Sequence, residues 1–161
     1  MPSSIMTEYE ILQKKFKSIR MIAIQSVVSI FLFGYIAYHG SQNDRPLSNN
    51  AMELKIMLLL LSIAFLFGLQ VIKETLRKKK PASEKTMTQT EIFTRQIFIS
   101  TLIGLMAAET PALFGVVASV NSKNFNDFYL FALISFAALI FHWPRYEVWE
   151  EELKKYLNQG R

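Results

Sequence analysis

The sequence predicts an all-α integral membrane protein with four transmembrane helices. Three observations support this prediction: long apolar runs separated by polar segments, the near absence of charge inside the runs, and the sorting of basic residues into alternate connections. Each run approaches the roughly 17–25 residues that a helix needs to cross a bilayer. A soluble bundle would instead show a polar stripe on each helix, and these runs show none. The runs are Met21–Tyr38, Ile56–Ile72, Ile97–Val120 and Phe128–Trp143.

Residues 1–20 predict an amphipathic helix ahead of the first run. Thr7 and Glu10 have the spacing of a capping box, and apolar residues follow them at helical spacing. A basic amphipathic segment of this kind is typical of helices that lie along a membrane surface. We therefore expect the segment 1–20 to lie along the cytoplasmic face.

The four runs are expected to pair into two hairpins, over residues 21–77 and 95–143, joined by a polar cytoplasmic linker at 78–94. The stretch LFGYIAYHGSQN (32–43) recurs as LFGVVASVNSKN (113–124), with six identities in twelve positions and an offset of 81. About one or two identities would be expected by chance. The repeat favours duplicated hairpins related by an axis along the membrane normal. The alternative is that glycine-bearing helix ends share a composition.

The segment 144–161 predicts a second amphipathic surface helix. Pro144 ends the last run, and Trp143, Tyr146 and Trp149 form an aromatic group of the kind that anchors proteins at a membrane–water interface. The apolar side of the expected helix carries Trp149, Leu153, Tyr156 and Leu157. We expect this side to face the membrane surface.

Basic residues predict the orientation. Of the 18 Lys and Arg residues, fifteen lie in the two tails and in the connection between the second and third runs (residues 73–96), and only Arg45, Lys55 and Lys123 lie in the two hairpin loops. By the positive-inside rule, we expect both termini to be cytoplasmic, and we expect the protein to lie in the cell (inner) membrane. The basic charge is thereby explained by topology and by contact with the lipid bilayer, so that no nucleic-acid partner is expected.

Glu109 is the one charged residue inside the runs, close to the expected midplane. A charge there costs about 3 kcal/mol, so we expect its side chain to face protein or water. Pro111 lacks the N–H that would bond the Ala107 carbonyl. Glu109, the Thr110 hydroxyl and this carbonyl could then form a site for H⁺ or Na⁺, because hard cations prefer oxygen ligands. No other cofactor is expected.

The other runs offer central hydroxyl groups as partners for Glu109, on Ser29, Ser62 and Ser135. Beside Glu109, a stripe of small residues predicts close helix packing: Gly104, Ala108, Ala112 and Gly115. Two interpretations stay open. Glu109 either locks the bundle as a protonated, hydrogen-bonded acid, or it exchanges a proton or cation.

An enzyme is not expected. The chain has no cysteine, and His39 and His142 lie at opposite ends of their runs, which excludes a two-histidine metal site within one protomer. Catalytic membrane sites need several convergent polar groups, and only one charge lies inside the runs. A lipid-handling enzyme would have to complete its site with residues from the cytoplasmic tails.

The third run resembles the ion-carrying helix of the rotary ATP synthase c subunit, the proteolipid. The resemblance lies in Arg95-Gln96, then Gly104 five residues before Glu109, then Phe114-Gly115 beginning five residues after it. It implies that Glu109 binds a proton or cation, with Thr110 as the neighbouring hydroxyl. The patterns ExPxLFG and PRxExW also resemble uncharacterised bacterial four-helix membrane proteins.

These observations favour a non-enzymatic membrane subunit or accessory protein with a buried protonatable Glu109. Its partner would be another copy of the chain or another membrane protein. The alternative is a proteolipid-like protein that binds or translocates a proton or a monovalent cation through Glu109.

Overall fold

The structure is a computed structural model, and it describes residues 2–42, 50–78 and 88–159. These residues form five α-helices and no β-strand. The helices are α1 (Pro2–Ser41), α2 (Ala51–Lys78), α3 (Gln89–Ser122), α4 (Asn126–His142) and α5 (Tyr146–Gln159). The all-α fold class is therefore confirmed.

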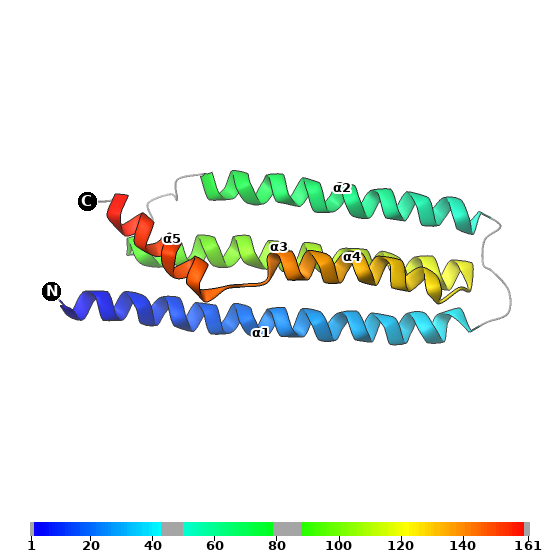
Figure 1. The fold of residues 1–161 in the computed structure, drawn as a ribbon, viewed down its shortest axis with the longest axis horizontal. Coiled ribbons are helices and arrows are strands. Elements are labelled where there is room, and N and C mark those ends of the chain that lie inside the picture. Colours follow the sequence, from blue (N-terminus) through cyan, green and yellow to red (C-terminus); the bar gives the residue numbers. More distant parts are fainter. Residues whose placement is uncertain (1, 43–49, 79–87, 160–161) are drawn as a thin grey trace.

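Helix α3 lies at the centre of an elongated molecule and packs against the four other helices (Figure 1). Helices α1 and α3 run in one direction, and α2 and α4 run in the opposite direction. The start of α1 and the whole of α5 lie at one end, which we call the termini end. The opposite end, where α1 and α3 finish, is called the hairpin end.

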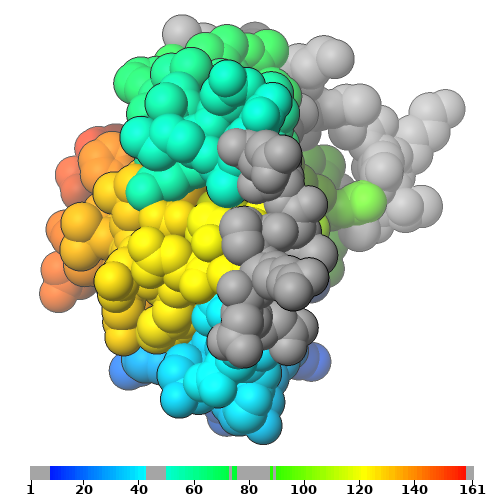
Figure 2. Space-filling model, turned by 90° about the vertical axis from the view of Figure 1, so that its right-hand side faces the viewer, coloured from blue at the N-terminus to red at the C-terminus, as the bar shows by residue number. Residues whose placement is uncertain are grey.

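The two expected hairpins differ in their packing. Helices α3 and α4 pack closely, whereas α1 and α2 lie on opposite sides of the α3–α4 pair (Figures 1 and 2). The two copies of the internal repeat nevertheless contact the same side chain of α4. A methyl group added at Gly34 would lie 3.1 Å from the ring of Phe128, and one added at Gly115 would lie 3.2 Å from the same ring. The repeat thus aligns two parallel helices rather than two equivalent hairpins.

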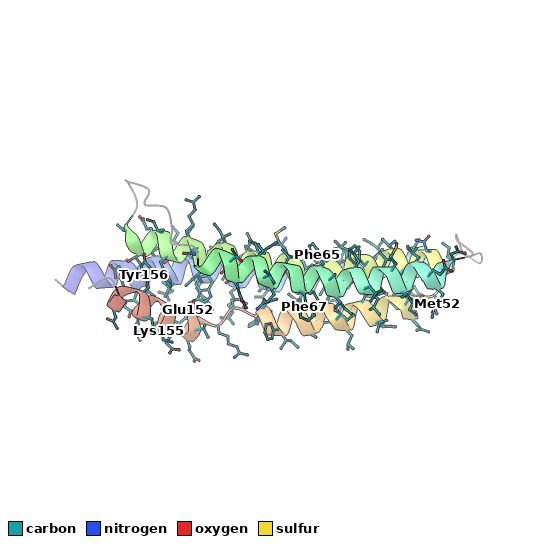
Figure 3. The ribbon with its side chains drawn as sticks, turned by 90° about the horizontal axis from the view of Figure 1, so that it is seen from above. Met52, Phe65, Phe67, Glu152, Lys155 and Tyr156 are labelled. Carbon is teal, nitrogen blue, oxygen red and sulfur yellow. The ribbon has the colours of Figure 1, made fainter. Side chains whose placement is uncertain are left out.

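Within the described residues, three helices are long and apolar enough to cross a membrane, or four if α4 and α5, which meet at a bend of 43°, form one broken span. Large apolar side chains cover the outer faces of these helices; Phe67 of α2 and Phe141 of α4 are 72% and 77% exposed. Figure 3 shows Met52, Phe65 and Phe67 along α2. Soluble proteins rarely expose an apolar surface of this extent. The protein is therefore suited to a multi-pass membrane location.

Helix α1 is one uninterrupted helix, which corrects the expected separate surface helix at 1–20. Its 40 residues span about 60 Å, twice the roughly 30 Å of a hydrocarbon core. The helix begins at Pro2, so Thr7 lies inside it rather than at its N-terminus. Leu12 and Ile19 are fully buried against other helices. The apolar side chains at positions 12 and 19 are therefore covered by protein rather than by the membrane surface.

Helix α5 also packs on protein. The ring of Phe16 in α1 makes edge-to-face contacts with Tyr146 and Trp149, at centroid distances of 5.2 and 5.6 Å. Phe93 of α3 stacks on Tyr156 at 4.5 Å. Trp149 is only 4% exposed, so it is not an interfacial anchor as expected; Trp143 is 37% exposed. The ends of α1 and α3 extend past α4, so these two helices cover the apolar side of α5.

The hairpin end is held by two polar contacts between helices. Lys55 Nζ of α2 lies 2.5 Å from Oδ1 of Asp127, whose side chain is 8% exposed at the start of α4. Lys123, which adopts a left-handed conformation at the end of α3, donates from Nζ to the Gly40 carbonyl at 2.9 Å. This second contact places a cation at the C-terminal end of α1, where the helix dipole is negative.

Candidate functional site

Glu109 lies half-buried on α3, at the edge of an outward-facing apolar stripe. Met106 and Leu113, three residues before it and four after it, are on the same side of the helix and are exposed. Among the residues that the structure describes, none forms a hydrogen bond or an ion pair with the Glu109 carboxylate. Its side chain is therefore open to a partner from outside the protomer.

The contacts of the two parallel helices show which residues of α1 are level with Glu109. A methyl group added at Gly40 would lie 2.5 Å from Cγ2 of Val120, and Gly34 and Gly115 share Phe128. A residue of α1 is thus at the same height along the bundle as the α3 residue about 81 positions later. Ser29 therefore lies within about one residue, or about 1.5 Å, of the height of Glu109. Ser29 Oγ donates to the Gln25 carbonyl at 3.0 Å. Of the three candidate serines, Ser29 lies on the helix that borders Glu109.

The oxygens expected to form an ion site with Glu109 lie at different positions around α3. Pro111 is fully buried, whereas Glu109 lies beside the open face, and residues two positions apart point to nearly opposite sides of a helix. The Ala107 carbonyl points along the helix toward Pro111, so it faces away from the carboxylate. Thr110 Oγ1 donates to the Met106 carbonyl at 3.2 Å. The oxygens expected beside Glu109 are thus distributed around α3.

Ser135 instead links α4 to the proline site of α3. The Ala112 N–H donates to Ser135 Oγ at 2.8 Å, and both residues are buried. Ser62 of α2 donates to the Leu58 carbonyl of its own helix at 2.8 Å. Leu58 packs with Phe114 and Ala118, on the side of α3 away from Glu109. Neither serine forms a hydrogen bond with the carboxylate.

Replacing Ser135 with alanine should lower the free energy of unfolding by about 1 kcal/mol, the size of an interhelical hydrogen bond inside a membrane. Thermal unfolding of the purified chain in detergent measures this change. Ser62→Ala is the matched control, because the Ser62 hydroxyl bonds within its own helix. Equal losses for the two variants would contradict a linking role for Ser135.

The small residues Gly104, Ala108, Ala112 and Gly115 are all buried in α3. Gly104 lies against the His142 ring, since a methyl group there would come within 3.2 Å of the imidazole. Gly115 lies against Phe128 and Phe131 of α4. This stripe therefore lets α4 approach α3 closely, and Glu109 lies beside the stripe at the edge of the open face.

A polar cavity lies where α4 meets α5, and the sequence analysis did not find it. This cavity, here called the elbow pocket, has a volume of about 420 Å³. Its polar lining comes from Ser100 and Thr101 of α3, His142 and Arg145 at the bend, and Glu152 of α5. The signal in the sequence was the shortest apolar run followed directly by Pro144 and Arg145. Figure 3 shows Glu152 on α5 at the termini end.

Within the described ranges, no group of three or more His, Asp or Glu side chains could hold a metal ion. Comparisons with protein families, curated proteins and solved structures found no match to this chain. The resemblance of α3 to the ion-carrying proteolipid helix therefore stays a prediction. The candidate site is defined by Glu109 and its position beside α1.

Proposed function

We propose that this chain is a non-enzymatic, multi-pass membrane subunit or accessory protein that binds another membrane helix over Glu109. Four spans with both termini in the cytoplasm best fit the distribution of basic residues. The observation that carries the proposal is a half-buried acid in an apolar surface, with no hydrogen-bond partner among the described residues. A polar group from a neighbouring helix removes the cost of leaving this acid in lipid.

The contacts on α3 support this side as the interface. Helices α1, α2 and α4 each cover part of α3, and the stripe of Met106, Leu113 and Val117 stays exposed beside Glu109. The partner is a second copy of this chain or a different membrane protein. In either case it contributes a hydroxyl, amide or basic group level with Glu109.

Crosslinking from a single cysteine tests the interface. Because the chain has no cysteine, Met106→Cys introduces one thiol beside Glu109, and Phe67→Cys on α2 is the matched exposed control. In native membranes, a thiol-reactive crosslinker should join the chain to one defined partner from position 106 and not from position 67. Adding Glu109→Leu should weaken this complex about fivefold, since one polar contact between helices contributes about 1 kcal/mol. Crosslinking that ignores Glu109, or that is equal at both positions, would contradict the proposal.

A proton carrier is the second candidate, and the geometry favours H⁺ over Na⁺. A single carboxylate can bind a proton alone, whereas a metal cation needs several oxygens, and those expected here are not gathered at Glu109. Carbodiimide labelling separates the two candidates. Labelling of Glu109 that Na⁺ does not block, together with proton flux that Glu109→Gln abolishes, supports the carrier. Absence of flux in the reconstituted chain supports the subunit.

A further inference from the structure

The elbow pocket combines a polar wall with an apolar rim. Arg145, at the bend between α4 and α5, supplies an exposed guanidinium group. The rim is formed by Ile140, Phe141 and Val148, all of which are exposed. A cavity of this size accommodates a small polar group, and the rim continues into the apolar surface of α4. The lining is thus suited to an amphiphile rather than to a water-soluble solute.

Arg145 and the start of α5 attract an anion at the bend, where the negative dipole end of α4, which finishes at His142, opposes them. Helix α5 has 14 residues and begins at Tyr146, directly after Arg145, so its positive dipole end adds to the guanidinium charge. The Trp149 N–H bonds to the Arg145 carbonyl, which leaves the N–H groups of the preceding turn without helical partners. Glu147 in that turn is exposed on α5. Glu152 also lines the pocket but is engaged in an interaction of its own.

The depth of the pocket matches lipid headgroups. Helix α4 has 17 residues and spans about 25 Å, slightly less than the roughly 30 Å of a hydrocarbon core. With α4 crossing the membrane, Trp143 and Pro144 reach the interface of the leaflet at the termini end. The rim residues Ile140 and Phe141 then lie at the level of the upper acyl chains.

We propose that the elbow pocket binds the phosphate-bearing headgroup of an anionic phospholipid. Arg145 and the start of α5 contact the phosphate, and an acyl chain lies along Ile140 and Phe141. This inference rests on the proposed membrane location of the chain but not on any role of Glu109.

Native mass spectrometry of the full chain in detergent tests the proposal. With phosphatidylglycerol added, one lipid should bind more tightly than phosphatidylcholine does. Arg145→Gln should reduce phosphatidylglycerol binding about fivefold, the effect of one basic residue on an anionic lipid. Val148→Glu, which places a like charge on the exposed rim, should reduce it similarly. Lys17→Gln is the control, because Lys17 is an exposed cation at the termini end outside the pocket.

Three outcomes would overturn the proposal: equal binding of the two lipids, equal losses for Arg145→Gln and Lys17→Gln, or full displacement of the lipid by millimolar inorganic phosphate. The last would identify free phosphate as the ligand. Carbonate extraction of native membranes is measured in parallel. A chain that extracts as a soluble protein contradicts the proposed membrane location, whereas a membrane-embedded chain without lipid selectivity contradicts the headgroup site alone.

Discussion

Gly115→Ala should lower the free energy of unfolding by about 2 kcal/mol, the usual effect of adding a methyl group to a tightly packed interior. The added methyl would lie 2.8 Å from Cβ of Phe131 and 3.2 Å from Cδ2 of Phe128. A Cβ atom is fixed to the backbone and cannot rotate away, so α3 and α4 would have to separate. Thermal unfolding in detergent should show a lower midpoint.

Gly68→Ala is the matched control for this prediction. Gly68 lies inside α2, and a methyl group added there would have no neighbour within 4 Å. The substitution should leave stability unchanged or raise it slightly, because alanine favours a helix over glycine. If both variants lose the same free energy of unfolding, the prediction that α3 and α4 approach closely at Gly115 is contradicted.

Asp127→Asn should lower the free energy of unfolding by about 2 kcal/mol, because the buried side chain loses its charge-assisted bond to Lys55. Either single change already breaks the contact between the two side chains. The Lys55→Met/Asp127→Asn double variant should therefore lose less stability than the two single variants lose together. Chemical or thermal unfolding of the four proteins measures this coupling energy.

Glu53→Gln controls for the position of Asp127 in a first helical turn. Glu53 lies in the first turn of α2 and is exposed, so its replacement should change stability by no more than about 0.5 kcal/mol. Additive losses at Lys55 and Asp127 would show that their contact contributes nothing to stability.

Hydropathy alone predicted where the apolar helices lie, because the length of an apolar run follows directly from the thickness of a membrane. It could not predict which helices touch. Nearly the whole surface of α2 is apolar, so no stripe on it distinguishes α1 from α3 as its neighbour. The same ambiguity applied to α5: an amphipathic helix with Trp149 and Leu153 on one side fits a membrane surface and a protein surface equally well.

The sequence likewise predicted only part of the candidate site. Position along the helix predicted that Glu109, Ser62 and Ser135 lie inside apolar runs. Rotation about each helix axis decides which of them meet, and that rotation is set by packing that one sequence does not reveal. Ser135 bonds to Ala112 because the small stripe of α3 faces α4. Glu109 lies only about 60° around α3 from Ala112, at the edge of the small stripe, where it borders the open face.

Because α1 is unbroken, its two ends belong to one continuous helix. The aromatic cluster around Phe16 and the Lys123 contact at Gly40 lie on this one helix, 24 residues or about 36 Å apart. Tilting the helix by about 10° around its midpoint would move Phe16, which lies about 8 Å from that midpoint, by about 1.4 Å. The contacts of α1 with α5 and with Lys123 are thus made by one continuous helix, with no break in the backbone between them.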